Sequence, residues 1–403
     1  MAQNVQSIKG MNDLFPLAAE GMDLLLWARI EEAARRVFPA FGYDEIRTPI
    51  AEKTELFTRS IGAATDVVEK EMYTFDDKGD SLTLRPEGTA GVVRAFVEHG
   101  FPQWDPQARF WYLGPMFRRE RPQKGRYRQF WQLGVECFGA RAPRVDAEQL
   151  AMVMALFAEV GIRGVVLQLA SLGDSACRPQ YKTLLQTFLR GVSEKLCEDC
   201  KRRIESNPLR VLDCKKEGCR AATADAPILL DHLCPPCAEH FSEVKRNLDL
   251  LGVKYEINPR IVRGLDYYVR TSFEFIHRVE GPDAALGSQN AVGGGGRYDG
   301  LVKELGGGDV PGIGFGLGME RLVLVLQAQE GASKRPPVVY LATMSKSAGD
   351  RAMTLARELR ARGLRVELDY ENKQKLGNQL DKANRRGARA ALILGDDEIA
   401  KGS

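Results

Sequence analysis

Residues 114–139, GPMFRRERPQKGRYRQFWQLGVECFG, hold the densest group of side chains that could do chemistry. Two strand-like arms flank a loop with one acid, Glu120, among the basic residues Arg118, Arg119, Arg121, Lys124, Arg126 and Arg128. A cationic loop of this kind is typical of a site for nucleotide phosphates or nucleic acid. The alternative is a solvated basic hairpin. Against it, Pro122 and Gly125 constrain the loop, and aromatic residues are interleaved with the charges.

The return arm of this hairpin carries polar side chains at a period of two. Gln132, Gly134 and Glu136 therefore share one face of the predicted strand. A glutamine and a glutamate on such a face indicate a site next to the basic loop.

A second stretch, TLRPEGTA at 83–90, marks the start of a predicted helix. Thr89 is in a position to be the N-cap, and Glu87 stands just before the helix without an evident partner. A simple capped helix start would explain the pattern. The functional interpretation is that Glu87 accepts a hydrogen bond from an ammonium group.

Three further strings combine charge, aromatic rings and glycine. RGLDYY at 263–268 clusters an arginine, a carboxylate and two phenols at a predicted bend, and four consecutive glycines at 293–296 precede RYDGL. GIGFGLGMERL at 312–322 leads into a helix with Arg321 in its first turn. Glycine runs alone are weak evidence for phosphate binding. A salt bridge with Glu320 is the plain alternative for Arg321.

The elements that must position these groups follow from periodicity. Amphipathic helices are predicted over residues 22–38, 89–97 and 145–160. Strands are predicted over 43–50, with Pro49 late in the strand, then over 72–75, 81–85 and 164–173. A hairpin is predicted from residues 257–262, a turn at Gly264 and a long strand from Tyr267.

From about residue 177 to residue 251 the composition becomes helical and rich in cysteine, which indicates an inserted subdomain. It holds Cys197, Cys200, Cys214, Cys219, Cys234 and Cys237. Two C-x-x-C pairs suit a tetrahedral zinc ion, so a structural Zn²⁺ on Cys197, Cys200, Cys234 and Cys237 is one hypothesis. The pairs are unusually far apart, and Cys214 and Cys219 are competing ligands. Free thiols are the other hypothesis.

Length and composition fit a soluble chain of two or three domains. No apolar run has the length of a signal peptide or a membrane span, so we expect a cytoplasmic protein that does not bind membranes. Eight cysteines in that compartment argue against a disulfide framework. Residues 331–403 contain 15 Lys and Arg against 9 Asp and Glu, a net charge of +6 that suits a polyanion.

The segment after a linker at 331–337 alternates strand, helix, strand, helix and strand. Its continuous apolar strands predict a parallel sheet, and hence an α/β domain.

The motifs resemble those of a known family. FRRE followed by RPQKGRYRQF is similar to motif 2 of class II aminoacyl-tRNA synthetases, and GIGFGLGMERL to motif 3. TLRPEGT, RGLDYY and GGRYDGL resemble signatures of the bacterial histidyl-tRNA synthetases in particular. The resemblance covers essentially the whole chain. It implies activation of L-histidine by ATP with Mg²⁺, giving histidyl-adenylate, then transfer to tRNA(His) by a homodimeric enzyme.

The resemblance also implies a domain plan. An α+β catalytic domain built on an antiparallel sheet would comprise residues 1–176 and 253–330, with a helical insertion at 177–252. An anticodon-binding-like α/β domain with a mainly parallel sheet would occupy 331–403, where the chain ends sooner than the family pattern leads us to expect. The proline-bearing strand near Pro49 would be motif 1, at the dimer interface.

Site roles carry over from the matching motifs. Arg118, Glu120 and Arg263 would be catalytic, with Arg118 and Arg263 at the α-phosphate, and ATP would be bound by Arg118, Arg126 and Arg321. Histidine would be held by Glu87, Thr89, Arg126, Gln132, Glu136, Tyr267 and Tyr268.

Two other functions remain as alternatives. The same fold serves as a histidine-binding regulatory subunit of ATP phosphoribosyltransferase, but such relatives lack the catalytic signatures present here. A sensor of uncharged tRNA is the third reading, and the complete set of site residues argues against it.

Overall fold

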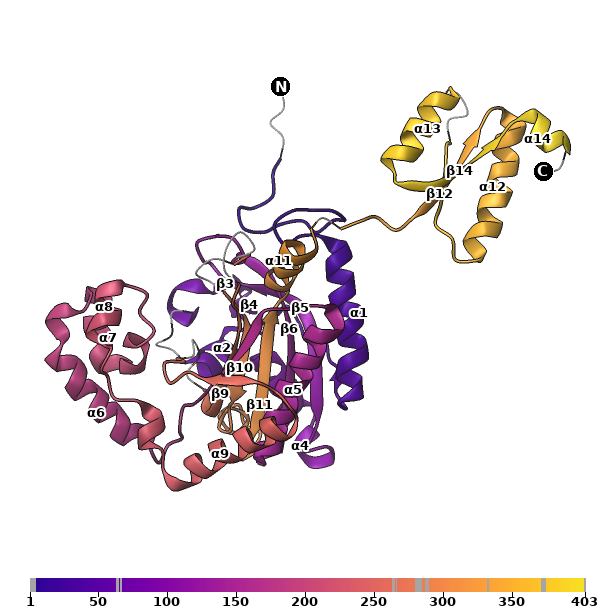
Figure 1. The fold of residues 1–403 in the computed structure, drawn as a ribbon. Helices are drawn as coiled ribbons and strands as arrows, with labels where there is room; N and C mark the ends of the chain where they lie inside the picture. The colour runs from indigo at the N-terminus through magenta and orange to yellow at the C-terminus, as the bar shows by residue number, and fades with distance from the viewer. Residues whose placement is uncertain are drawn as a thin grey trace. The chain divides into compact units, whose positions relative to one another are not determined.

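The computed structural model describes residues 5–62, 65, 67–262, 265, 267–279, 285–286, 290–331, 333–370 and 375–401. The chain divides into two compact units, Met1–Gly331 and Ala332–Ser403 (Figure 1). The expected combination of an α+β unit on a mostly antiparallel sheet and a parallel α/β unit is confirmed.

The larger unit is organised around an eight-stranded sheet with the order β1-β5-β6-β11-β10-β9-β7-β8. In that order the strands are Asp44–Glu45, Arg109–Phe117, Gln129–Phe138, Gly312–Gly318, Ala291–Arg297, Val269–His277, Val165–Ser171 and Tyr255–Ile257. Neighbours run antiparallel except the outer pairs β1–β5 and β7–β8. A smaller antiparallel sheet has the order β2-β4-β3, formed by Ala51–Lys53, Asp80–Leu84 and Tyr73–Asp77.

Alternation along β5 divides the main sheet between two cores. Trp111 faces a large cluster that includes residues of three helices, α1 (Leu24–Ala40), α5 (Pro143–Val160) and α11 (Met319–Glu330). Phe110 and Tyr112 face the opposite cluster with α3 (Thr89–Glu98). The sheet is therefore covered on both faces, and its polar side chains need specific partners.

The remaining helical segments of this unit are short or belong to the insertion. Outside it they are α2 (Thr54–Ile61), the π-helix Val67–Glu71, α4 (Phe101–Trp104) and α10 (Leu301–Glu304). The insertion contains α6 (Arg178–Gly191), α7 (Glu198–Ser206), α8 (Glu217–Ala222), α9 (Pro235–Leu250) and the 3₁₀ segments Ser193–Lys195, Pro208–Val211 and Leu229–His232.

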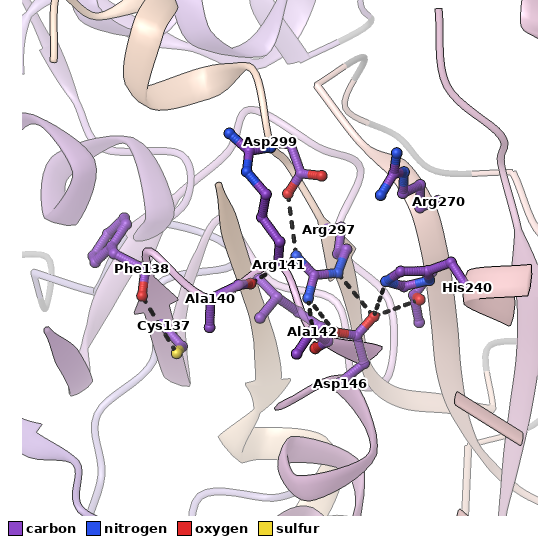
Figure 2. A network of polar contacts seen from close by, with 12 residues as sticks. Cys137, Phe138, Ala140, Arg141, Ala142, Asp146, His240, Arg270, Arg297 and Asp299 are labelled. Carbon is purple, nitrogen blue, oxygen red and sulfur yellow. Dashed lines mark hydrogen bonds and ion pairs between the residues drawn. The ribbon is translucent and has the colours of Figure 1, made fainter. Parts of the chain in front are cut away.

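A buried polar network joins the insertion to the sheet (Figure 2). Arg297 of β10 pairs with Asp146 of α5, and both side chains are fully buried. His240 of α9 lies 3.6 Å from the same carboxylate. Burial, with help from Arg297 and Arg270, lowers the pKa of His240 to about 4, so this contact involves a neutral imidazole.

Two sequence predictions about strands were wrong. The strand expected over residues 43–50 is reduced to β1, because the chain leaves the sheet before Pro49, which has no N–H to donate. The hairpin expected after residue 257 does not form, since β7 lies between β8 and β9 and pairs with both.

The smaller unit has a three-stranded parallel sheet with the order β13-β12-β14. Its elements are β12 (Val338–Thr343), α12 (Lys346–Ala361), β13 (Val366–Leu368), α13 (Leu376–Arg385), β14 (Ala388–Leu394) and α14 (Asp396–Lys401). The predicted strand–helix alternation is confirmed. Among all the helices that the structure describes, none has the length and apolar character to cross a membrane.

Candidate functional site

A cavity of about 310 Å³ opens where the β5–β6 hairpin, β10, β11 and the start of α11 meet. Its lining includes the predicted residues Glu87, Thr89, Arg118, Glu120, Arg126, Gln132, Tyr267, Tyr268 and Arg321. These side chains come from segments more than 200 positions apart in the chain. The antiparallel order of the sheet brings them together.

Glu87 is fixed by the start of α3. Its carboxylate accepts hydrogen bonds from the backbone N–H groups of Thr89 (2.7 Å) and Ala90 (2.8 Å). The prediction that Thr89 caps this helix is therefore wrong: Gly88 is the N-cap residue, and the neighbouring carboxylate satisfies the free N–H groups. Burial raises the pKa of Glu87, and these bonds oppose the shift.

Gln132 is held against the glycines of β11. Its Oε1 accepts from the Gly88 N–H at 3.1 Å. A Cβ at Gly316 would stand only 1.9 Å from Gln132 Nε2, so a side chain there would displace the amide. The absence of a side chain at Gly316 thus leaves room for the Gln132 amide at the cavity wall.

Glu136 lies on the same strand face but deeper, and it is fully buried. Its carboxylate bonds to three hydroxyl groups, those of Thr89 (2.7 Å), Tyr298 (2.5 Å) and Tyr112 (3.3 Å). Burial raises the pKa of Glu136 to about 8. Glu136 is not one of the described residues that line the cavity. It lies behind the wall and fixes the groups that form it.

Tyr267 and Tyr268 form an aromatic wall above Glu136. Their ring centroids are 4.6 Å apart, and Tyr267 meets Tyr298 edge-on at 5.9 Å. Arg263 and Asp266 of the same motif lie outside the described residues.

The cavity is also lined by arginines. Arg118 donates from Nε to the Pro86 carbonyl at 2.9 Å, and its guanidinium stands 5.2 Å from the centre of the Phe130 ring. Arg126 forms an ion pair with the buried Glu120. Burial lowers the pKa of both arginines. Arg118 and Arg126 are therefore cations held in fixed positions, and such cations suit a polyanionic ligand.

Arg321 is also positioned by backbone groups. It donates from Nε to the Gly125 carbonyl (2.8 Å) and from Nη1 to the Ala291 carbonyl (2.5 Å). Burial and the nearby Arg126 and Arg118 lower its pKa to about 10. Glu320 instead accepts from the Trp131 N–H at 2.9 Å, so it points at the hairpin backbone.

The geometry agrees with comparisons to known proteins. The family model described as histidyl-tRNA synthetase matches residues 10–322, and the one described as anticodon binding domain matches residues 338–403. The chain belongs to the histidyl-tRNA synthetase family. The resemblance inferred from the motifs is thereby confirmed.

Relatives of this family match over nearly the full length. A histidine–tRNA ligase of Geobacter metallireducens is 51% identical over 399 residues, which cover 99% of this chain and 93% of the relative. One from Anaeromyxobacter dehalogenans is 51% identical over 400 residues, with the same coverage. Apo histidyl-tRNA synthetase of S. aureus superposes with a TM-score of 0.78 at 36% identity, covering 99% of this chain and 93% of that one.

The alternative functions weighed from the sequence also have a structural counterpart. An ATP phosphoribosyltransferase regulatory subunit/histidyl-tRNA synthetase from Bacillus halodurans C has a TM-score of 0.68 at 18% identity, covering 98% of this chain and 99% of that one. At that identity the likeness shows the fold alone.

Sequence reasoning missed three residues of this histidyl-tRNA synthetase site. Tyr112 and Tyr298 bond to Glu136, and Glu274 of β9 lines the cavity. Tyr298 was visible within RYDGL. Tyr112 could have been found from the alternation on β5, which puts it opposite Gly134 in the register.

The zinc hypothesis for Cys197, Cys200, Cys234 and Cys237 was wrong in its grouping. The two C-x-x-C pairs belong to different clusters. The first pair meets Cys214 and Cys219, and the second meets Asp174 and Cys177. The long separation in sequence reflects an intervening run of helices, so each pair finds nearer partners.

Proposed function

We propose that this chain catalyses the ATP-dependent activation of L-histidine and the transfer of the histidyl group to the 3′ end of tRNA(His). One observation carries the proposal. A single cavity is lined by acceptors for an ammonium group, by two tyrosines and by three arginines. These are the groups needed to join an amino acid to a nucleoside triphosphate.

The histidine end is formed by residues from three segments. Glu87, Thr89 and Gln132 are the polar groups available to the substrate ammonium, and Arg126 to its carboxylate. Tyr267 and Tyr268 enclose the imidazole, with Glu136 behind them as a positioning residue. Because these groups are held by backbone bonds and close packing, they are arranged before the substrate arrives.

The phosphate end accelerates the first step by neutralising charge. An oxygen of the histidine carboxylate attacks the α-phosphorus of ATP, the bond to the β-phosphate bridging oxygen breaks, and pyrophosphate leaves. Arg118 stabilises the negative charge at the α-phosphate, and Glu120 holds the neighbouring Arg126 in place. Arg321 binds the phosphates farther from the ribose. Arg263 has a matching role at the α-phosphate on the motif evidence alone.

Mg²⁺ fits the same end of the site. It binds through one or two carboxylates together with phosphates and water, and Glu120 and Glu274 of the lining would be its carboxylate ligands. When bound, it supplies further neutralisation of the leaving pyrophosphate.

In the second step a hydroxyl of the terminal tRNA ribose attacks the histidyl carbonyl, and AMP leaves. The smaller unit would bind the anticodon, in keeping with its family match at residues 338–403. A cytoplasmic homodimer completes the proposal, on the strength of the family resemblance.

Histidine-dependent exchange of labelled pyrophosphate into ATP tests the first step. We expect exchange with histidine but not with the other amino acids, and its loss in Arg263→Ala. Exchange that is equally fast with another amino acid contradicts the proposal. Histidine binding in calorimetry without any exchange would favour a regulatory protein instead.

A further inference from the structure

Seven of the eight cysteines gather in two clusters at the insertion. The inner cluster consists of Cys197, Cys200, Cys214 and Cys219. The neck cluster consists of Asp174, Cys177, Cys234 and Cys237. Cys137, the remaining cysteine, is buried in the core of the sheet.

Each cluster has the donors of a tetrahedral metal site. In each, one ligand atom from every residue lies within 4.8 Å of the other three. Zinc–sulfur bonds of about 2.3 Å place tetrahedral sulfurs roughly 3.8 Å apart, so small shifts suffice to close either cluster on an ion. Four thiolates, or three thiolates and a carboxylate, are both zinc ligand sets.

Three of these cysteines stand at the start of a helix, and helix capping does not explain why cysteine occupies these positions. Cys177, Cys197 and Cys234 are the N-cap residues of α6, α7 and α9, and none of the three side chains makes a capping hydrogen bond. Ser, Thr, Asp and Asn are the residues that favour this position. A thiolate at a helix N-terminus is stabilised by the helix dipole, which is what a metal ligand requires.

Backbone groups already point at sulfur in both clusters. The Asp174 N–H donates to Cys177 Sγ at 3.3 Å, and the Cys197 N–H donates to Cys219 Sγ at 3.2 Å. Gly173, with φ +59°, makes room in the neck, because a Cβ there would stand 2.5 Å from Cys177 Sγ. These contacts orient the sulfur atoms as second-sphere partners orient metal ligands.

We propose that the insertion binds two zinc ions, one in the inner cluster and one in the neck cluster. The inner ion would hold α7 and α8 together, where the helices have 9 and 6 residues and a small apolar core. The neck ion would tie the end of β7 to the starts of α6 and α9, which closes the insertion at its base. This inference does not depend on the proposed function.

Disulfides account for the arrangement less well. The neck cluster has three thiols and a carboxylate, so any disulfide leaves one thiol unpaired beside Asp174. Arg270 donates to Asp174 Oδ2 at 3.2 Å and leaves Oδ1 facing the thiols of Cys177 and Cys234. An oxygen facing sulfur atoms is the arrangement of a mixed ligand set.

The test is the metal content of the full chain, purified without chelator and measured by mass spectrometry for zinc and iron. We expect two zinc ions per chain in the unchanged protein. The pair Cys214→Ser and Cys219→Ser should keep one, and so should the pair Cys234→Ser and Cys237→Ser. Cys137→Ser, the matched control outside both clusters, should keep two.

Three results would overturn the proposal. These are fewer than two zinc ions in the unchanged protein, iron in place of zinc, or a double variant that keeps both ions. A single ion that the Cys214→Ser and Cys219→Ser pair keeps and the Cys234→Ser and Cys237→Ser pair loses would restore one shared site on the two C-x-x-C pairs.

A second measurement needs no substitution, in case the variants fold poorly. After replacement of the metal by cadmium-113, we expect two NMR resonances, one for an all-sulfur site and one for a site of sulfur and oxygen. A single resonance, or two with all-sulfur shifts, contradicts the assignment of the neck cluster.

Discussion

Arg297 and Asp146 form an ion pair 2.6 Å long, and neither side chain is accessible to solvent. Arg297 also donates to the Ala140 and Ala142 carbonyls and to Asp299 (Figure 2). The guanidinium thus ties β10 to the start of α5, and it comes from the RYDGL string that suggested a substrate site. Its role here is structural.

Arg297→Met should destabilise the larger unit by about 3–5 kcal/mol, because it leaves the Asp146 carboxylate buried without a partner. All four tryptophans lie in this unit, so urea unfolding followed by tryptophan fluorescence reports on it. Arg190→Ala, which breaks the exposed pair with Glu205, is the control and should cost far less, because solvent screens an exposed ion pair. If the two variants lose the same free energy of unfolding, the buried pair contributes no more to stability than an exposed pair.

Tyr298→Phe should raise the KM for histidine roughly 10-fold and leave the KM for ATP unchanged. The substitution removes the hydroxyl that bonds to Glu136 at 2.5 Å, and a hydrogen bond to an ionisable group is worth about 1.5–3 kcal/mol. Pyrophosphate exchange at varied substrate concentrations measures both constants. Tyr43→Phe, which removes a buried hydroxyl bonded to Gln149, controls for lost stability and should change neither KM.

Glu320→Gln should flatten the dependence of stability on pH. Burial raises the pKa of Glu320 from 4.5 to about 8, so between those values the folded protein binds a proton that the unfolded chain has released. The free energy of unfolding therefore falls as pH rises through this window, by up to about 1.4 kcal/mol per pH unit for one proton. Urea unfolding from pH 5 to pH 8 should show a shallower fall in the variant. Glu330→Gln, at the exposed end of the same helix, should behave like the unchanged protein.

Arg321→Ala should raise the KM for ATP by roughly 10- to 100-fold, since it removes a cation that lines the cavity. The KM for histidine should stay within about twofold. Arg121→Ala removes an arginine of the β5–β6 hairpin loop that does not line the cavity, and it should leave exchange unchanged. If both variants weaken ATP binding equally, general charge attraction rather than a defined contact explains the effect.

The sequence predicted most local structure and nine of the residues that line the cavity. The alternation at Gln132, Gly134 and Glu136 correctly indicated one strand face, because a period of two is a direct consequence of strand geometry. The depth of Glu136 was not predictable in this way. It depends on Tyr298, which is 162 positions away in sequence.

Errors arose where distant segments compete for a partner. Strands β8 and β9 are close in sequence, yet β7 separates them, and local patterns do not encode that choice. The two C-x-x-C pairs were wrongly assigned to one metal site for the same reason. At the start of α3 the error was chemical: Thr89 was predicted to cap the helix, whereas the Glu87 carboxylate accepts from two of its backbone N–H groups.

The pairing of β7 with β8 has a consequence for how this architecture can vary. Parallel neighbours always require a long connection, usually with a helix, and α9 is a return helix of 16 residues, about 24 Å in length. Helices α6 to α8 are thus extra material added to a connection that the sheet needs in any case. A module in that place can be lengthened, shortened or exchanged during evolution without altering the order of the strands.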